Sequence, residues 1–242
     1  MFFIYEKGTD LKLYPLMMNI DGKSVAVVGG GTVALRKVNS LLQYGAKVTV
    51  ISPVLKLELL ELSEEGTIRW VAKLFNDKLF DEIPNLALVF GTTDDRDVNV
   101  EIFRAALARR IPCNIADVPD LCSFTVPAVI SRGDLSIAVS TGGTSPALAR
   151  RIREQLEGHF GQEYVKLTLI LGEIRQEVLG LGGSSEENKN MFMQIVDSDL
   201  LQAIKENNSN RAKTLLRSIL PNNIDPDPIV DRAMHPLEVV NK

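Results

Sequence analysis

Residues 24–37, SVAVVGGGTVALRK, decide the fold of this chain. Small and apolar residues run directly into three glycines, and a segment with helical periodicity follows them. The succession of strand, tight turn and helix is typical of a unit that holds a pyrophosphate at the N-terminus of the helix. In this GxGxxA motif, Gly29 would permit the turn, Gly31 would let a phosphate approach the backbone, and Ala34 would let the helix lie close to the strand. The motif predicts nucleotide binding at residues 29–31, with a purely structural glycine turn as the alternative.

Up to Asp117, segments with strand character alternate with helical segments at short spacing. Strands are expected at residues 25–28, 47–51, 67–72, 86–90 and 112–116. The intervening helices are expected directly after the glycine turn, at residues 55–62 and at residues 98–110. This alternation predicts an α/β fold with a Rossmann-type, mostly parallel sheet and right-handed crossovers. Ligands of such sheets bind at the carboxyl ends of the strands. We therefore expect residues 29–31, residues 92–95 and Asp117 to meet in one crevice.

The end of the second strand departs from the usual dinucleotide-binding pattern. A Rossmann unit that binds a free ribose 2′-hydroxyl usually carries Asp or Glu at this place. Here the strand is followed by Ser52, Pro53 and Val54, and no acid is present. Side-chain chemistry alone therefore does not distinguish NAD from NADP, and backbone groups would have to supply the polar contacts.

Polar residues also follow two further strands. The candidates for cofactor contacts after the strand at residues 86–90 are Thr92, Thr93 and Asp94. Either Asp94 or Asp95 could reach a cofactor hydroxyl, but an N-cap of the next helix is the interpretation that we favour. Asp117 could act as a general base that takes up a proton while a hydride leaves in the other direction. Its alternative role is that of a turn residue before Val118 and a proline.

The alternation ends after Asp117. Residues 123–130 and 135–140 are rich in β-formers and are separated by a short turn, which predicts an antiparallel hairpin. The next turn, TGGTSP at residues 141–146, opens a helix at residues 147–156 that carries three arginines. Backbone N–H groups and arginines suit an anionic ligand, whereas the alternative is an ordinary capped helix with a solvated basic face. The candidate substrate-binding residues are Thr141, Gly142, Gly143, Thr144, Ser145 and Arg150.

The rest of the chain is predicted to be helical at residues 164–179, 191–204 and 211–219, with a Gly/Ser break at residues 180–185. The proline-containing end is expected to be a loose tail. We divide the chain into an N-terminal extension (1–13), a nucleotide-binding domain (14–117), a hairpin and helix segment (118–160), a helical domain (161–220) and a tail (221–242).

Bulk properties exclude several classes of function. The chain has 242 residues, 45% hydrophobic residues and a net charge of -4, which does not suit a general nucleic-acid binder. Two cysteines, Cys113 and Cys122, form no CxxC pattern and suit a reducing compartment. With only two histidines, no metal-ligand spacing is visible. No apolar run is long enough to span a bilayer and no signal peptide is evident, so we expect a cytoplasmic protein.

Three linked segments carry a resemblance to a known family. They are YPLMMNIDGKSVAVVGGGTVALRKVNSLLQYGAKVTVISP, then GTTDD, then CNIADVPDLCSFTVPAVISRGDLSIAVSTGGTSPALARRIREQLE. In order and spacing they resemble the precorrin-2 dehydrogenase family, which is also the dehydrogenase/ferrochelatase module of siroheme synthases. The resemblance covers about residues 14–160, and the remainder is similar only in being helical.

The resemblance implies NAD-dependent oxidation of precorrin-2 to sirohydrochlorin, and in some members ferrous iron insertion that gives siroheme. The aspartate of the NxxDxP motif, which falls on Asp117, is implied to be catalytic. The implied NAD contacts fall on Thr32, Val33, Pro53 and Val54. Members are similar in forming homodimers through the hairpin and the helical end. Thr141 stands where some members have a serine associated with substrate binding and phosphorylation. No uroporphyrinogen methyltransferase domain follows, so we expect another protein to perform the methylation.

Two other interpretations remain open. A nucleotide-sensing regulatory module, for instance of the potassium-transport type, shares the Rossmann start but needs neither a general base nor a polyanion site. The TGGTSP segment and its arginines argue against that interpretation. An NADP-dependent reductase of a small carbonyl compound would need a Tyr/Lys or His pair in the crevice, and none is evident.

Overall fold

The computed structural model describes residues 13–182 and 184–235 of the chain. Most of the expected N-terminal extension and the last seven residues of the expected tail lie outside this part. The chain divides into two compact units, Met1–Val126 and Pro127–Lys242. Each unit has its own hydrophobic core.

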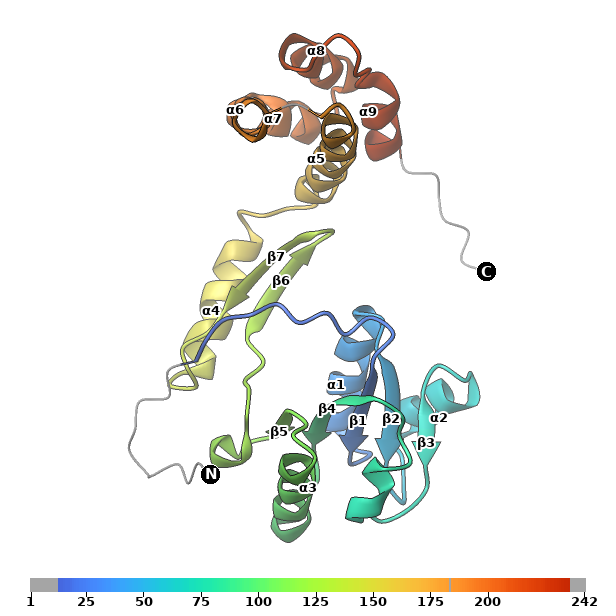
Figure 1. Ribbon diagram of the computed structural model, residues 1–242. Coiled ribbons are helices and arrows are strands. Elements are labelled where there is room, and N and C mark those ends of the chain that lie inside the picture. Colours follow the sequence, from blue (N-terminus) through green and yellow to red (C-terminus); the bar gives the residue numbers. More distant parts are fainter. Residues whose placement is uncertain (1–12, 183, 236–242) are drawn as a thin grey trace. The chain divides into compact units, whose positions relative to one another are not determined.

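The first unit contains a five-stranded parallel sheet in the order β3-β2-β1-β4-β5 (Figure 1). Its strands are β1 (Ser24–Val28), β2 (Lys47–Ile51), β3 (Arg69–Val71), β4 (Leu86–Gly91) and β5 (Cys113–Ile115). The connections contain α1 (Thr32–Gln43), α2 (Leu57–Glu64), the 3₁₀ turn η1 (Asp77–Phe80) and α3 (Arg96–Ala108). The α/β class, the Rossmann-type sheet and its parallel strands are thus confirmed. The strand order reverses between β1 and β4, which is where sheets of this kind bind ligands.

Strand β1 lies at the centre because it is apolar on both faces. Val25 and Val27 belong to the core that α1 covers, together with Ala34 and Val38 of that helix. The alternate residues of the strand belong to the core on the other face, against α3. Period-two alternation in a wholly apolar strand therefore supplies two cores at once.

The second unit begins with an antiparallel hairpin of β6 (Ala128–Arg132) and β7 (Leu135–Val139), followed by α4 (Pro146–Glu157). The predicted hairpin is confirmed, but its first strand starts at Ala128 and not at residue 123. Pro127 has no N–H to donate to a neighbouring strand. The 3₁₀ turn η2 (Pro119–Leu121) lies shortly before residue 123. Strand pairing therefore starts only after the proline.

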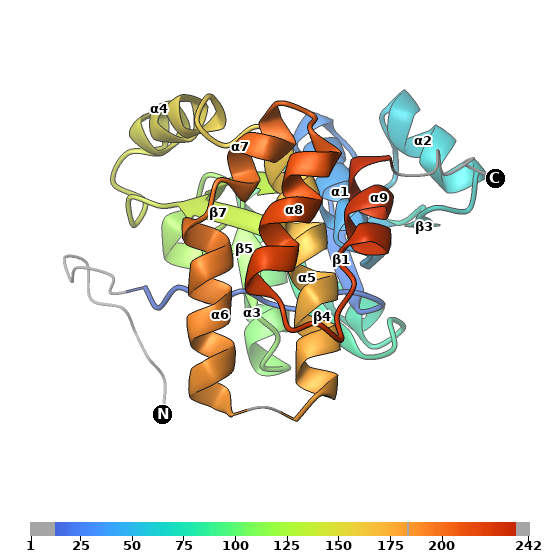
Figure 2. The same cartoon turned by 90° about the horizontal axis from the view of Figure 1, so that it is seen from above.

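The remaining helices of the second unit pack around an apolar core (Figure 2). They are α5 (Glu163–Gly180), α6 (Ser185–Asp197), α7 (Leu200–Lys205), α8 (Ser209–Ile219) and α9 (Asp227–Met234). The single helix predicted at residues 191–204 is wrong, because α6 ends at Asp197 and α7 starts anew at Leu200. The Ser198 hydroxyl donates to the carbonyl of Ile195, and it accepts from the N–H of Leu200 at 3.2 Å, so one side chain serves both helix ends.

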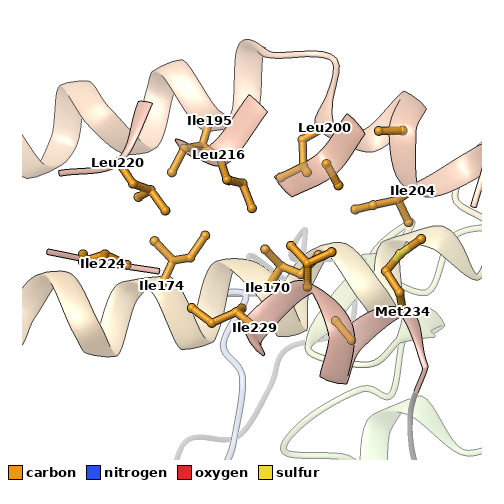
Figure 3. Close-up of a cluster of buried hydrophobic side chains, with 14 of the residues drawn as sticks. Ile170, Ile174, Ile195, Leu200, Ile204, Leu216, Leu220, Ile224, Ile229 and Met234 are labelled. Atoms are coloured by element: carbon orange, nitrogen blue, oxygen red, sulfur yellow. The ribbon is translucent and has the colours of Figure 1, made fainter. Parts of the chain in front are cut away.

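The loose tail predicted from residue 221 is also wrong for the described residues. Helix α9 buries Ile229, Val230, Ala233 and Met234 in the helical core. Figure 3 shows Ile229 and Met234 in this cluster with Ile170 and Ile174 of α5. The prolines suggested an irregular end, but Pro228 lies in the first helical turn, where a missing N–H costs nothing.

Candidate functional site

The carboxyl ends of the strands in the first unit are joined by backbone hydrogen bonds. The N–H of Gly29, just after β1, donates to the carbonyl of Ile51 at 2.9 Å. The N–H of Thr92, just after β4, donates to the carbonyl of Val28 at 2.8 Å, and the N–H of Ala116, just after β5, donates to that of Gly91 at 2.8 Å. The loops after β1, β4 and β5 therefore lie at one edge of the sheet, as the parallel topology predicts.

Two of the three glycines are needed for packing inside the protein. Gly29 has a φ of 119°, and a Cβ there would lie 2.5 Å from the Thr92 hydroxyl oxygen. A Cβ on Gly30 would lie 2.1 Å from the carbonyl oxygen of Val54 and 2.8 Å from the Ser52 hydroxyl oxygen. The N–H of Lys56 also donates to the carbonyl of Gly30 at 2.8 Å. The glycine turn is therefore locked between the loops that follow β4 and β2.

Gly31, in contrast, faces open space. A Cβ on Gly31 would meet no atom within 4 Å, and its φ of −92° is accessible to any residue. Gly31 is also the N-cap of α1, where no side chain caps the helix and the first turn contains no acid. The N–H groups of this turn are thus available to an anion, and the helix dipole favours negative charge there. The open glycine and the uncapped helix fit a dinucleotide pyrophosphate.

This contrast between adjacent glycines gives a first prediction. Gly30→Ala is expected to destabilise the first unit by about 1–3 kcal/mol, because the new methyl group collides with backbone. Gly31→Ala is expected to leave stability within about 0.5 kcal/mol and to weaken dinucleotide binding at least tenfold, since the methyl group fills the space before the helix. Urea unfolding followed by fluorescence of Trp70, the single tryptophan, measures the first effect, and calorimetric titration with NAD measures the second. Equal stability losses in the two variants would contradict the assignment.

The other candidate cofactor residues border the glycine turn, although several are already engaged within the protein. Pro53 and Val54 are exposed in the loop that touches Gly30. The Thr92 hydroxyl donates to the carbonyl of Val28 at 2.9 Å, so it fixes the two strand ends to each other. The Thr93 hydroxyl lies 2.9 Å from the amide oxygen of Asn99.

The two acidic residues after β4, Asp94 and Asp95, differ in their contacts. The Asp95 carboxylate accepts from the N–H groups of Asp97 and Val98 at 2.9 Å and 3.1 Å, so the expected N-cap role is confirmed for Asp95. Asp94 is exposed at the same loop. It is therefore the member of the pair whose carboxylate is not used by the helix cap.

Asp117 follows β5 directly and is held in an unusual backbone conformation. Its φ is 60°, the left-handed region that Asp and Asn tolerate better than other non-glycine residues. Its side chain is exposed at the strand-end edge. The turn role of Asp117 is thus real, and the turn presents the carboxylate beside the strand ends.

The TGGTSP segment lies in the second unit. The Thr141 hydroxyl oxygen accepts from the N–H of Ser145 at 3.0 Å, and Ser145 is the N-cap of α4, with its hydroxyl accepting from the N–H of Leu148 at 3.3 Å. Gly142 and Gly143 have φ values of 62° and 87°, and a Cβ on either would meet nothing within 4 Å. Thr144 is exposed beside them. The turn is therefore rigidly closed on itself while its backbone faces open space.

The arginines of α4 differ in how far they are engaged. Arg150 pairs with Glu154 at 2.8 Å, and the Arg153 guanidinium pairs with Glu157 at 2.6 Å. Arg150 nevertheless stays largely exposed, and exposed pairs of this kind are weak. It can therefore exchange Glu154 for a ligand carboxylate at little cost.

Both cysteines of the first unit have thiols whose pKa is raised by burial. Burial raises the pKa of the Cys113 thiol to about 12, so this thiol stays protonated at neutral pH. Burial also raises the pKa of the Cys122 thiol. Within residues 13–182 and 184–235, no group of three His, Cys, Asp or Glu side chains is arranged to hold a metal ion. In the same ranges, no helix is long and apolar enough to cross a membrane.

Lys37, the last residue of the SVAVVGGGTVALRK stretch, is not among the expected site residues, yet its ammonium lies 5.3 Å from the centre of the Phe90 ring on β4. Helical spacing from Ala34 and Val38 could have placed it on the sheet-facing side of α1.

Two family models match this chain in sequence. An NAD(P)-binding model matches residues 16–128, and a model described as sirohaem biosynthesis protein central matches residues 132–159. The first match covers the whole parallel sheet, and the second runs from the hairpin through α4.

Known proteins resemble the chain over most of its length. A siroheme synthase of Hydrogenovibrio crunogenus is 34% identical over 206 residues, which are 85% of this chain and 44% of that protein. A siroheme synthase of Methylobacillus flagellatus is 36% identical over 200 residues, covering 81% and 42%. This chain therefore spans less than half the length of these relatives. A solved structure of SirC, a precorrin-2 dehydrogenase, has a TM-score of 0.68 and 29% identity, and it covers 86% of this chain and 98% of that one.

Proposed function

Because this chain belongs to the family that comprises the N-terminal module of siroheme synthases and SirC, we propose that it oxidises precorrin-2 to sirohydrochlorin with NAD as the acceptor. The observation that carries the proposal is the placement of Asp117 and the open glycine turn at the same edge of the sheet. A carboxylate and a dinucleotide site on one edge are what a dehydrogenase needs.

Each part of the strand-end edge has a defined task in this proposal. Gly31 and the first turn of α1 would hold the pyrophosphate, and the loop with Pro53 and Val54 would contact the adenosine half through its backbone. Thr32 and Val33 would contact the phosphates from the first turn of the helix. When bound, NAD supplies the acceptor for a hydride. No acidic residue follows β2 to bind a free ribose 2′-hydroxyl, so the sequence at this strand end does not select NAD over NADP. NAD as the cofactor is therefore part of the proposal.

The oxidation removes one hydride and one proton from precorrin-2. The hydride leaves with the electron pair of a C–H bond, and the second hydrogen leaves as a proton. Asp117 would accept that proton on its carboxylate and release it to solvent, which its exposure allows. The products are sirohydrochlorin, the reduced cofactor and the proton, so charge and electrons balance.

The direct test is anaerobic incubation of the full chain with enzymatically generated precorrin-2 and NAD. Conversion of the tetrapyrrole with stoichiometric NADH formation is expected in the absorbance spectra. NAD binding without turnover would instead favour a nucleotide-sensing module. The same assay also tests ferrous iron insertion, the second activity that the family resemblance implies. Ferrous iron is added after the oxidation, and siroheme formation above a no-protein control is expected only if the chain inserts the metal.

A second prediction concerns the substrate carboxylates. We propose that the open TGGTSP turn and Arg150 bind the acidic side chains of precorrin-2. Arg150→Gln is expected to raise the KM for precorrin-2 about three- to tenfold, because the variant loses one exposed charge-assisted hydrogen bond to a substrate carboxylate. The kcat should stay nearly unchanged because the group is used in binding only. Arg104→Gln on α3, an exposed arginine of the first unit, serves as the control. An unchanged KM for precorrin-2 would show that Arg150 does not bind the substrate.

We also propose a homodimer. The family resemblance implies this association. The hairpin forms a sheet of only two strands that packs against α4, so its outer strand edges have no strand partner within the described part of the chain and could pair with a second copy. Light scattering behind size-exclusion chromatography should give twice the chain mass of 26.7 kDa, and a monomer at micromolar concentration would overturn this.

A further inference from the structure

Asn99 is a buried polar residue on a helix face that is otherwise apolar. It is 5% exposed, and the other buried residues of α3 are Ile102, Ala105 and Ala106. Taking an amide out of water is unfavourable unless its N–H groups and its oxygen find hydrogen-bond partners. The partners of the Asn99 amide therefore indicate which part of the protein requires it.

Both groups of the Asn99 amide bind a single residue, Thr93, in the loop after β4. The side-chain N–H donates to the carbonyl of Thr93 at 2.9 Å, and the Thr93 hydroxyl donates to the side-chain oxygen of Asn99 at 2.9 Å. The same hydroxyl lies 3.1 Å from the carbonyl of Asp95. Gly91 leaves room for this pair of bonds, because a Cβ there would lie 3.3 Å from the Asn99 side-chain oxygen. The buried amide thus holds Thr93 by its backbone and by its side chain.

The start of α3 does not depend on the Asn99 side chain. Asp95 is the N-cap, and its carboxylate accepts from the N–H groups of Asp97 and Val98. The backbone N–H of Asn99 donates to the carbonyl of Asp95 at 3.0 Å, a helical bond that any residue except proline would make. The helix therefore uses only the backbone of Asn99, and the side-chain amide is left to hold the loop.

The loop that Asn99 holds is also attached to the glycine turn. The N–H and the hydroxyl of Thr92 both donate to the carbonyl of Val28, at 2.8 Å and 2.9 Å. A Cβ on Gly29 would lie 2.5 Å from the Thr92 hydroxyl oxygen, so the two loops are in close contact. Thr92 and Thr93 are therefore both fixed from within the protein, which leaves Asp94 as the exposed residue of this loop before the helix cap.

The place of this loop on the sheet indicates which half of a dinucleotide it serves. A dinucleotide binds across the point where the strand order reverses, with one half on each side. The order reverses between β1 and β4, and the loop with Pro53 and Val54 follows β2, on the side proposed for the adenosine half. The loop after β4 lies on the other side of β1, where the nicotinamide half would bind.

We infer that Asn99 is a positioning residue for the nicotinamide half of the cofactor, acting through the conformation in which it holds Thr93 and Asp94. The inference rests on the proposed function, since it requires NAD at the strand-end edge. Asn99 is buried and need not touch the cofactor itself. A loop that is already held in its binding conformation loses less entropy when the ligand binds, so its affinity is higher than that of a mobile loop.

The first test compares two ligands by calorimetric titration of the full chain. NAD carries both halves, whereas ADP carries the adenosine and the two phosphates but no nicotinamide. Asn99→Leu should weaken NAD binding about tenfold and leave ADP binding within about twofold, because only the loop after β4 loses its support. Ile102→Val, a matched change on the buried face of the same helix, should leave both affinities within about twofold. An unchanged NAD affinity of Asn99→Leu, or equal weakening for NAD and ADP, would overturn the inference.

A second test leaves the core of the first unit unchanged. Thr93→Val removes the hydroxyl that binds Asn99 and should weaken NAD binding about threefold, whereas Thr93→Ser keeps the hydroxyl and should bind NAD within about twofold of wild type. In an Asn99→Leu background, Thr93→Val should cause no further loss, because the two changes remove the same hydrogen bond. Additive losses would show that Thr93 meets the cofactor without help from Asn99, and they would overturn the inference.

Binding and turnover separate this inference from the proposed reaction. A wild-type chain that binds NAD but does not oxidise precorrin-2 would refute the reaction, and the affinities of the Asn99 and Thr93 variants would still decide the inference. Wild-type turnover together with an NAD affinity that Asn99→Leu does not change would refute the inference alone.

Discussion

Replacing Asp117 by Asn is expected to lower kcat for precorrin-2 oxidation by about 10²–10⁴-fold, the range associated with losing a general base. Asn is the correct replacement because it tolerates the φ of 60° at this position, whereas Ala would add backbone strain to the chemical change. The amide cannot accept the proton that leaves the substrate. The KM for NAD should change little, since the glycine turn and α1 are untouched. Anaerobic steady-state kinetics and calorimetric NAD titration measure the two quantities.

A nearby carboxylate provides the control for this result. Asp120 is exposed in η2, three residues further along the chain, and Asp120→Asn removes the same charge from the same segment. Its kcat should stay within about twofold of wild type, because surface substitutions away from a site have small effects. Full activity of Asp117→Asn would show that Asp117 is not the general base. Equal losses in both variants would point to the charge of the segment and not to one catalytic group.

Leu216→Ala in α8 is expected to lower the free energy of unfolding of the second unit by about 2–5 kcal/mol. Leu216 is fully buried in the helical core, near Ile174 and Ile195 (Figure 3). Truncation removes apolar contacts and leaves a cavity that close-packed neighbours fill only in part. Leu179→Ala in α5 is the control, since that side chain is 54% exposed and should cost far less.

The two units allow the stability effect of Leu216→Ala to be localised. Trp70, the single tryptophan, lies in β3 of the first unit, so its fluorescence reports on that unit. Most helical residues lie in the second unit, so far-UV circular dichroism reports mainly on the second unit. Urea unfolding should therefore show the loss in the circular dichroism signal. A loss seen only in Trp70 fluorescence would contradict the assignment of Leu216 to the helical core.

Local patterns were sufficient for the parallel sheet and for the main outline of its site. The apolar strand, the glycine turn and the periodicity of α1 are short-range features, and the structure reproduces each of them. Parallel topology then brings the loops after β1, β4 and β5 to one edge, so this geometry followed from the sequence without any knowledge of contacts. The N-cap role of Asp95 was predictable for the same reason, because a cap depends only on the next three residues.

What only the tertiary structure decided depends on contacts between distant residues. The prolines near the end of the chain suggested a loose tail, but burial against α5 makes α9 part of a core. Gly30 differs from Gly31 only because the loop with Val54 presses against it. The contact between the Lys37 ammonium and the ring of Phe90, more than fifty residues away, likewise forms only in the folded chain. Sequence periodicity assigns a residue to a face, but packing decides which partner from another element occupies that face.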